Sequence, residues 1–211
     1  MVAAPIEIDH PLMRSPWTPP YTVDTLFELP ETDLRFEVLE GQLIVSPATT
    51  PMYGAGLTRL VRLLNRVLPE TVWPIQAIAI RLPNGDGPVP DLVLTSAPDM
   101  TAYPKGLPAE LVHTVVEVVS PSNAKTDRET KTGGYARAGI PCYWRIEQRP
   151  WKEHFGPVPA IVVRHRGEDG NWDQIVAAAG SVTELPVVVD AHGTIVSIKI
   201  DPVILNGKLQ V

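Results

Sequence analysis

The chain has 211 residues, of which 44% are hydrophobic and 20% charged, and its formal net charge at pH 7 is −6. This length supports one domain with a substantial core, and the composition is typical of a globular protein. The negative charge argues against a protein that coats DNA passively, because such affinity comes largely from lysines and arginines that neutralise phosphates.

The sequence also gives no sign of export, disulfides or membrane insertion. Its single cysteine, Cys142, excludes a disulfide within one chain and a cage of cysteine ligands around a metal. The first ten residues lack the basic and apolar regions of a signal peptide, and no apolar run reaches the roughly 20 residues of a membrane helix. We therefore expect a cytoplasmic protein without membrane contact.

The N-terminal part is predicted to hold an arm, a short helix and a hairpin. Residues 1–20 contain five prolines and show no periodicity, so we expect an irregular arm. Residues 21–29 are predicted to form a helix with Thr22 as its N-cap. Strands are expected at Arg35–Leu39 and Gln42–Ser46, joined by a Glu-Gly turn whose glycine tolerates positive φ.

The clearest helical periodicity lies in residues 52–68. Apolar residues recur there on one helix face, at Leu57, Leu60, Val61, Leu64, Val67 and Leu68. Three arginines lie on the other side of this helix, at Arg59, Arg62 and Arg66. They are expected to form a solvated face, and the alternative is a strip that touches a phosphate backbone.

The second half is predicted to be rich in strands. These are expected at residues 71–82, 89–95, 111–119, 142–147, 161–166, 172–177, 187–189 and 194–200. A polar helix is expected over residues 126–138, opened by a capping box from Thr126 to Glu129 and closed by Gly139. This order predicts an α/β or α+β domain with a mixed sheet over residues 21–200 and a tail over residues 201–211.

Two acids interrupt strands that are otherwise apolar. Asp91 follows Pro90 and opens Asp-Leu-Val-Leu, and Glu117 lies within an apolar run of residues 111–119. Carboxylates are seldom buried without a partner, so acids at the ends of two neighbouring strands are expected to share a divalent cation. The alternatives are that Asp91 caps a turn and that Glu117 forms a buried ion pair with an arginine.

Glu37 is the candidate third acid, because it too lies inside an apolar strand. Two carboxylates about 4 Å apart repel by roughly 4 kcal/mol at an effective dielectric of 20, and a third acid adds to that cost. Hard oxygen ligands favour magnesium or manganese, and such an ion can activate water and stabilise charge on a phosphodiester. A purely structural role for Glu37 remains open at this point.

Such a reaction would also gain from a cation near the phosphate. Lys125, Arg128 and Lys131 follow the strand of Glu117 at spacings of three, so one helical face could return them to the strand's end. An ordinary solvated lysine is the other interpretation of Lys131.

Several of these motifs resemble a known family. The run Arg35-Phe-Glu-Val-Leu-Glu-Gly-Gln-Leu-Ile-Val-Ser-Pro47 is similar to the opening signature of the bacterial putative restriction endonuclease family, once a domain of unknown function. The resemblance continues in order with Pro90-Asp91-Leu-Val-Leu94, Val116-Glu-Val-Val-Ser-Pro-Ser122, Lys131, Tyr135, residues 138–140 and Tyr143-Trp144. It covers roughly residues 20 to 190.

The resemblance implies a fold and a reaction. The family belongs to the PD-(D/E)xK nuclease superfamily, so the implied fold is restriction-endonuclease-like, a mixed central sheet flanked by helices with a β-rich C-terminal part. The implied activity is hydrolysis of DNA phosphodiester bonds with Mg²⁺ or Mn²⁺. Asp91 and Glu117 would be metal ligands, and Glu37 would be a further acidic ligand from an early element. A homodimer is compatible with the sequence.

Two positions depart from the family pattern. The superfamily lysine follows the second acid after one residue, where this chain has Val119, so the resemblance assigns that role to Lys131, with Lys125 as the competitor. Many members carry a histidine near the start of the first long helix, where this chain has Tyr53. The predicted function is a metal-dependent endonuclease acting on DNA. The alternatives are an inactive binding or assembly module of the same fold and a metal-dependent hydrolase of RNA or nucleotides.

Overall fold

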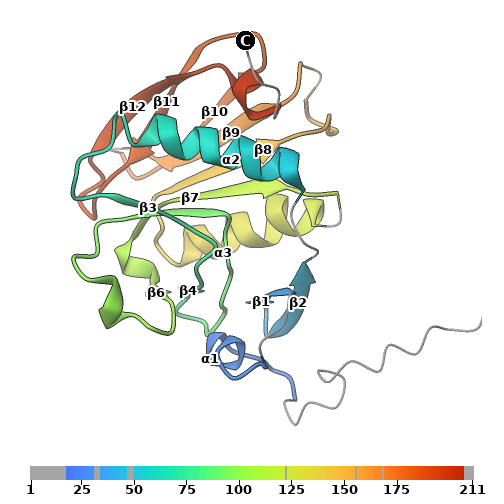
Figure 1. Ribbon diagram of the computed structural model, residues 1–211, viewed down its shortest axis with the longest axis vertical. Helices are drawn as coiled ribbons and strands as arrows, with labels where there is room; N and C mark the ends of the chain where they lie inside the picture. The colour runs from blue at the N-terminus through green and yellow to red at the C-terminus, as the bar shows by residue number, and fades with distance from the viewer. Residues whose placement is uncertain are drawn as a thin grey trace, which may run out of the picture.

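A six-stranded mixed sheet forms the centre of the molecule, with strand order β10-β9-β8-β7-β5-β3 (Figure 1). The computed structural model describes residues 18–30, 34–46, 50–121, 123–154, 156–167 and 169–206. The sheet consists of β3 (Trp73–Gln76), β5 (Leu92–Thr95), β7 (Val112–Val119), β8 (Cys142–Glu147), β9 (Ala160–Arg166) and β10 (Trp172–Ala178). Strands β7 and β8 are parallel, and the other neighbouring strands are antiparallel.

Shorter elements surround this sheet. The helices are α1 (Val23–Leu26), α2 (Pro51–Leu64) and α3 (Lys131–Arg137), and α3 is preceded by a π-helical turn, η4 (Thr126–Thr130). The 3₁₀ turns within the described residues are η2 (Met100–Ala102), η3 (Ala109–Leu111) and η5 (Pro202–Asn206). The paired strands outside the central sheet are β1 (Arg35–Leu39) with β2 (Gln42–Ser46), β4 (Ile80–Arg81) with β6 (Leu107–Pro108), and β11 (Thr183–Val188) with β12 (Ile195–Ile200).

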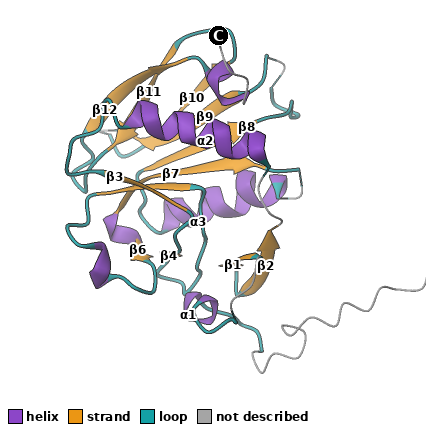
Figure 2. Ribbon diagram, in the orientation of Figure 1, coloured by secondary structure: helices purple, strands orange, loops and turns teal. Residues whose placement is uncertain are grey.

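The two longer helices cover opposite faces of the sheet (Figure 2). Side chains alternate between faces along a strand, so Val116 and Val118 of β7 pack in the cluster that contains Leu60 of α2. Val115 packs on the other face, in the cluster that contains Tyr135 of α3. A mixed sheet flanked by helices, with a β-rich C-terminal part, is the fold class that we predicted. The same alternation assigns Glu117 to the face that α3 covers.

The β1–β2 hairpin forms at the predicted residues. Its two turn residues, Glu40 and Gly41, have φ values of 52° and 69°. Positive φ at both central positions suits the twist of a two-residue hairpin, and glycine adopts it without strain. The turn therefore fixes the register in which Glu37 lies opposite Ile44.

Residues 71–82 do not form the single strand that we predicted. They divide into β3, which joins the central sheet, and β4, which pairs with β6. The break falls at Ala77, whose φ of 52° lies in the left-handed region and cannot continue an extended strand.

The polar helix differs from its prediction at the start. Lys125 already has a right-handed helical backbone, so Thr126 lies inside the helix and the predicted capping box does not form. Gly139, with a φ of 82°, follows the end of the helix as expected. The first helix, α1, is shorter than its predicted range of 21–29, although Thr22 is its N-cap.

The described residues cover only part of the predicted N-terminal arm and of the predicted C-terminal tail. Most of the predicted arm, residues 1–17, lies outside the described residues, as do residues 207–211 of the predicted tail. Within that tail, η5 packs on α2, where Arg59 donates to the carbonyl of Ile204 at 3.0 Å and Leu205 is buried. None of the helices in the described ranges combines the length and the apolar character that crossing a bilayer requires.

Two glycines of α2 provide a matched test of this packing. A Cβ on Gly56 would lie 2.7 Å from the carbonyl oxygen of Leu205, whereas a Cβ on Gly54 would meet nothing within 4 Å. Gly54→Ala should raise the free energy of unfolding by about 0.5–1 kcal/mol, because alanine loses less backbone entropy in a helix. Gly56→Ala should lower it by about 1–3 kcal/mol through overpacking. Denaturant melts measure both, and equal shifts would contradict the α2–η5 contact.

Candidate functional site

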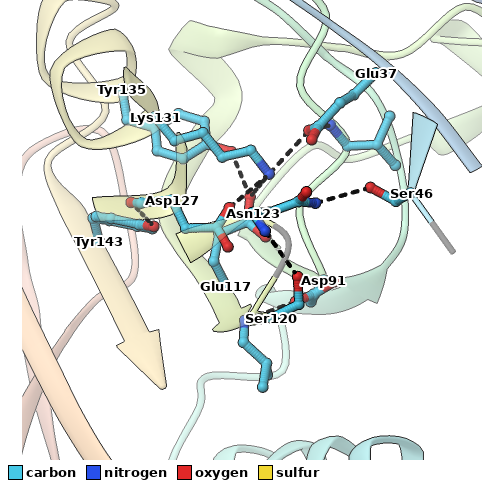
Figure 3. A network of polar contacts seen from close by, with 12 residues as sticks. Glu37, Ser46, Asp91, Glu117, Ser120, Asn123, Asp127, Lys131, Tyr135 and Tyr143 are labelled. Carbon is cyan, nitrogen blue, oxygen red and sulfur yellow. Dashed lines mark hydrogen bonds and ion pairs between the residues drawn. The ribbon is translucent and has the colours of Figure 1, made fainter. Parts of the chain in front are cut away.

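One cavity brings together the acids and the lysine that the sequence singled out. It has a volume of about 300 Å³, and its walls include Glu37, Asp91, Glu117, Asp127 and Lys131. These side chains come from β1, the start of β5, β7, η4 and α3, so distant parts of the sequence meet at the end of β7 (Figure 3). Of the four residues predicted to form the site, all four line this cavity.

A larger cleft lies elsewhere and has a different character. It measures about 570 Å³ and is bounded by α1, β1, β3 and β6. Every described residue in its wall is uncharged. Of the two, the smaller cavity is therefore the one whose walls carry charged side chains.

Strand pairing places Asp91 beside Glu117. Leu92, the first residue of β5, lies opposite Val116 of the antiparallel β7. Asp91, just before β5, therefore lies beside Glu117, which follows Val116. Oδ2 of Asp91 accepts a hydrogen bond of 2.7 Å from the backbone N–H of Val118. Both acids are buried, at 5% and 3% exposure.

Lys131 lies among three carboxylates. Its Nζ is 2.9 Å from Oε2 of Glu37, 2.9 Å from Oε1 of Glu117 and 3.3 Å from Oδ1 of Asp127. The hydroxyl of Tyr135 also donates to Oε1 of Glu117, at 2.9 Å. Because Oε1 accepts two bonds, the orientation of the Glu117 carboxylate is fixed.

Only one of the three candidate cations enters the cavity. Lys125 is exposed, and Arg128 forms an ion pair of 2.7 Å with Glu147 of β8. The expected shared face of the three residues assumed regular helical spacing, and the π-helical turn changes that spacing. Lys131 thus lies against Glu117, and its two competitors do not.

Sequence reasoning missed two members of the cluster. Arg35 Nη1 lies 2.7 Å from Oδ1 of Asp91, and its Nη2 donates to the carbonyl of Val89. The alternation of β1 places Arg35 on the same side as Glu37, a signal that was present in the sequence. Asp127 precedes Lys131 by one helical turn, the spacing at which opposite charges commonly pair.

Tyr53, the residue that replaces the family histidine, also reaches the cluster. Burial raises the pKa of its hydroxyl far above the ordinary value, and the adjacent Asp91, to which it is hydrogen-bonded, raises it further. The hydroxyl therefore stays protonated and serves as a donor to Asp91. Tyr53, where the sequence departs from the family pattern, therefore lies in the wall of the cavity.

The cavity has a surplus of negative charge. Four acids, Glu37, Asp91, Glu117 and Asp127, line it together with three cations, Arg35, Lys131 and Arg149, which leaves a formal charge of −1. Burial raises the pKa of Glu117 to about 8, and the nearby acids add to this while Lys131 opposes it. Burial likewise raises the pKa of Asp127 to about 6.

Lys131 stays charged in this setting. Burial favours the neutral amine, but Glu117, Glu37 and Asp127 outweigh it and raise the pKa of Lys131 above its ordinary value. A lysine held in this way is a permanent positive charge and not a base.

The donor set fits one hard divalent cation. Mg²⁺ is commonly held by one or two carboxylates and completes its coordination with waters and substrate phosphate, and its charge would offset the negative surplus of the cavity. Asp91 and Glu117 are the carboxylates positioned for this. No cluster of three or more acids, histidines or cysteines arranged around a metal position occurs in the described part of the chain. The expected third ligand, Glu37, is bonded to Lys131 and to the N–H of Val89, the latter at 3.4 Å.

Comparisons with known proteins agree with this fold. A family model described as Uma2, putative restriction endonuclease, matches residues 23–193. A crystal structure of a putative nuclease belonging to DUF820 from Anabaena variabilis ATCC 29413 superposes with a TM-score of 0.58 and 18% sequence identity. The match covers 84% of this chain and 95% of that chain, which shows a shared fold. No curated protein matches this chain.

Proposed function

Because the chain belongs to the Uma2 putative restriction endonuclease family, we propose that it hydrolyses phosphodiester bonds in DNA with a divalent ion, Mg²⁺ or Mn²⁺. The observation that carries the proposal is the cavity itself. Two buried carboxylates on neighbouring strands, a buried lysine and a surplus charge of −1 surround one space. Purely structural ion pairs would be expected to balance their charges, because uncompensated buried charge is costly.

Each residue has a distinct part in this proposal. Asp91 and Glu117 would hold the ion, and a bound ion would supply an activated water and stabilise charge on the phosphate. Tyr135 fixes the Glu117 carboxylate through its hydroxyl, and Lys131 does so through Nζ. Glu37 orients Lys131 through its 2.9 Å ion pair.

Lys131 contributes charge and not proton transfer. Its pKa is raised, so Nζ remains an ammonium throughout the pH range in which DNA is stable. A fixed positive charge beside the substrate stabilises the extra negative charge that develops on a phosphate during attack. This function suits a buried lysine whose partners hold it in one position.

Substrate comparison tests this proposal. Supercoiled plasmid and a structured RNA of similar length should be incubated with the protein in Mg²⁺, in Mn²⁺ and in chelator. We expect the plasmid to be nicked or linearised only when the metal is present. Faster cleavage of the RNA would reassign the substrate, and intact substrates in every condition would favour an inactive module of the same fold.

A further inference from the structure

The guanidinium of Arg35 contacts Asp91, one of the two carboxylates proposed to bind the divalent ion. Its Nη1 contacts Oδ1 of Asp91 at 2.7 Å, and the other oxygen of Asp91 accepts from the N–H of Val118 at 2.7 Å. Both oxygens of the carboxylate therefore have partners. A metal ion that binds Asp91 must compete with its present donors, the hydroxyl of Tyr53 and the guanidinium of Arg35, of which only Arg35 is a cation.

We propose that Arg35 is the phosphate-binding residue of this site, held on Asp91 until a divalent ion displaces it. The inference rests on the proposed function and deepens it. The ligand that Arg35 receives is a phosphodiester oxyanion. Every charge keeps an opposite partner in this exchange, because the ion binds Asp91 while Arg35 binds the phosphate.

The position and the chemistry of Arg35 both support this exchange. Its side chain is 28% exposed and lines the cavity, whereas that of Lys131 is only 3% exposed. Of the cations in the cavity wall, an entering substrate therefore meets Arg35 and the exposed Arg149 before Lys131, and Arg35 is the one bonded to Asp91. A guanidinium presents several donors in a planar fork that matches two oxygens of a phosphate, a geometry that lysine lacks.

The backbone of Arg35 is anchored, so only its side chain has to turn. Val38, in the same strand, exchanges two backbone hydrogen bonds with Gly87, at 3.0 and 2.9 Å. Glu37 accepts from the N–H of Val89. With β1 fixed at these points, rotation about the long side chain of Arg35 moves its guanidinium from the carboxylate into the cavity.

Arg35→Gln should have opposite effects on two ligands. Calorimetric titration with Mn²⁺ alone should show binding about tenfold tighter than in the parent, the scale of one lost charged hydrogen bond. Titration of the Mn²⁺-loaded protein with thymidine 5′-monophosphate should show binding about tenfold weaker, for the same reason. A general loss of structure would weaken both, so the opposite signs identify the exchange.

Two further variants serve as comparisons for Arg35→Gln. Arg81→Gln is the matched control, because Arg81 also bonds one carboxylate, Asp24 at 3.0 and 3.2 Å, and one carbonyl, that of Lys105 at 3.1 Å. It should change neither affinity. Arg35→Lys retains the charge without the fork, so it should bind Mn²⁺ as the parent does and the mononucleotide more weakly.

The outcomes separate the two proposals. If the parent binds Mn²⁺ and Arg35→Gln binds it no more tightly, or binds the mononucleotide as well as the parent does, the role of Arg35 is overturned and the nuclease proposal stands. If the parent does not bind Mn²⁺ at all, the metal-dependent function fails and the exchange at Asp91 fails with it.

Discussion

Lys131→Met is expected to lower the free energy of unfolding by about 3–5 kcal/mol at pH 7 and to abolish cleavage. The lysine is 4% exposed and forms ion pairs with three buried carboxylates, so its removal leaves these carboxylates without the opposite charge of Lys131. Methionine fills a similar volume, which separates the loss of charge from the loss of packing. Urea melts at several pH values measure the effect.

The pH dependence of this loss has a defined sign. Burial already raises the pKa values of Glu117 and Asp127 in the folded protein while Lys131 lowers them, so removing Lys131 raises both pKa values further above those of the unfolded chain. Their contribution to stability is then present at low pH and is lost as the pH rises through the folded-state pKa values. The deficit of Lys131→Met should therefore be small near pH 4 and grow toward pH 8. A deficit that is independent of pH would show that packing, and not charge, is what Lys131 provides.

Two other variants serve as comparisons for Lys131. Lys125→Met removes an exposed lysine six positions earlier and should leave stability within about 0.5 kcal/mol and cleavage unchanged. Lys131→Arg retains the charge but cannot place a compact ammonium among the acids, so it should cleave poorly. If Lys125→Met is inactive while Lys131→Met is active, the assignment of the site lysine is wrong.

Asp91→Asn and Glu117→Gln are each expected to abolish Mn²⁺ and Mg²⁺ binding and to reduce cleavage by at least about 100-fold. Each substitution retains the shape of the side chain and removes one anionic ligand. The fold should persist, because the amide oxygen of the introduced asparagine can still accept from the N–H of Val118, and Lys131 retains two carboxylate partners without Glu117. Calorimetry measures the affinity, and thermal melts verify folding.

Asp86→Asn is the control for these substitutions. Asp86 is a buried acid at 7% exposure, and it bonds the N–H of Gly41 and the side chain of Asn84 outside the acidic cavity. Its substitution should leave metal affinity unchanged. Unaltered affinity in Asp91→Asn or Glu117→Gln, or a large loss of melting temperature in the metal-free proteins, would instead favour structural ion pairs.

Patterns within single strands predicted much of the fold. The alternation and the Glu-Gly turn of the β1–β2 hairpin located both of its strands, and the apolar run around Glu117 located β7. The position of Asp91 beside Glu117 followed from placing an acid in each of two apolar strands. These signals are local, because a buried charge inside an apolar run is visible without knowledge of its partner.

The missed features depend on tertiary context. Ala77 breaks residues 71–82 through a positive φ, which a sequence rarely reveals when the residue is not glycine. The π-helical turn before Lys131 alters which side chains share a face, so spacing alone could not separate Lys131 from Arg128. Arg35 was missed because its partner, Asp91, lies 56 residues away in the sequence.

Nicking of supercoiled plasmid in Mn²⁺, measured for the parent and for Glu117→Gln purified in the same way, tests the central claim most directly. We predict that the parent converts the plasmid to open-circular or linear DNA at a rate that depends on the Mn²⁺ concentration and is zero in chelator. Glu117→Gln, folded as shown by its thermal melt, should leave the plasmid supercoiled. Equal nicking by the two proteins, or nicking that persists in chelator, would contradict the assignment of nuclease activity to this cavity.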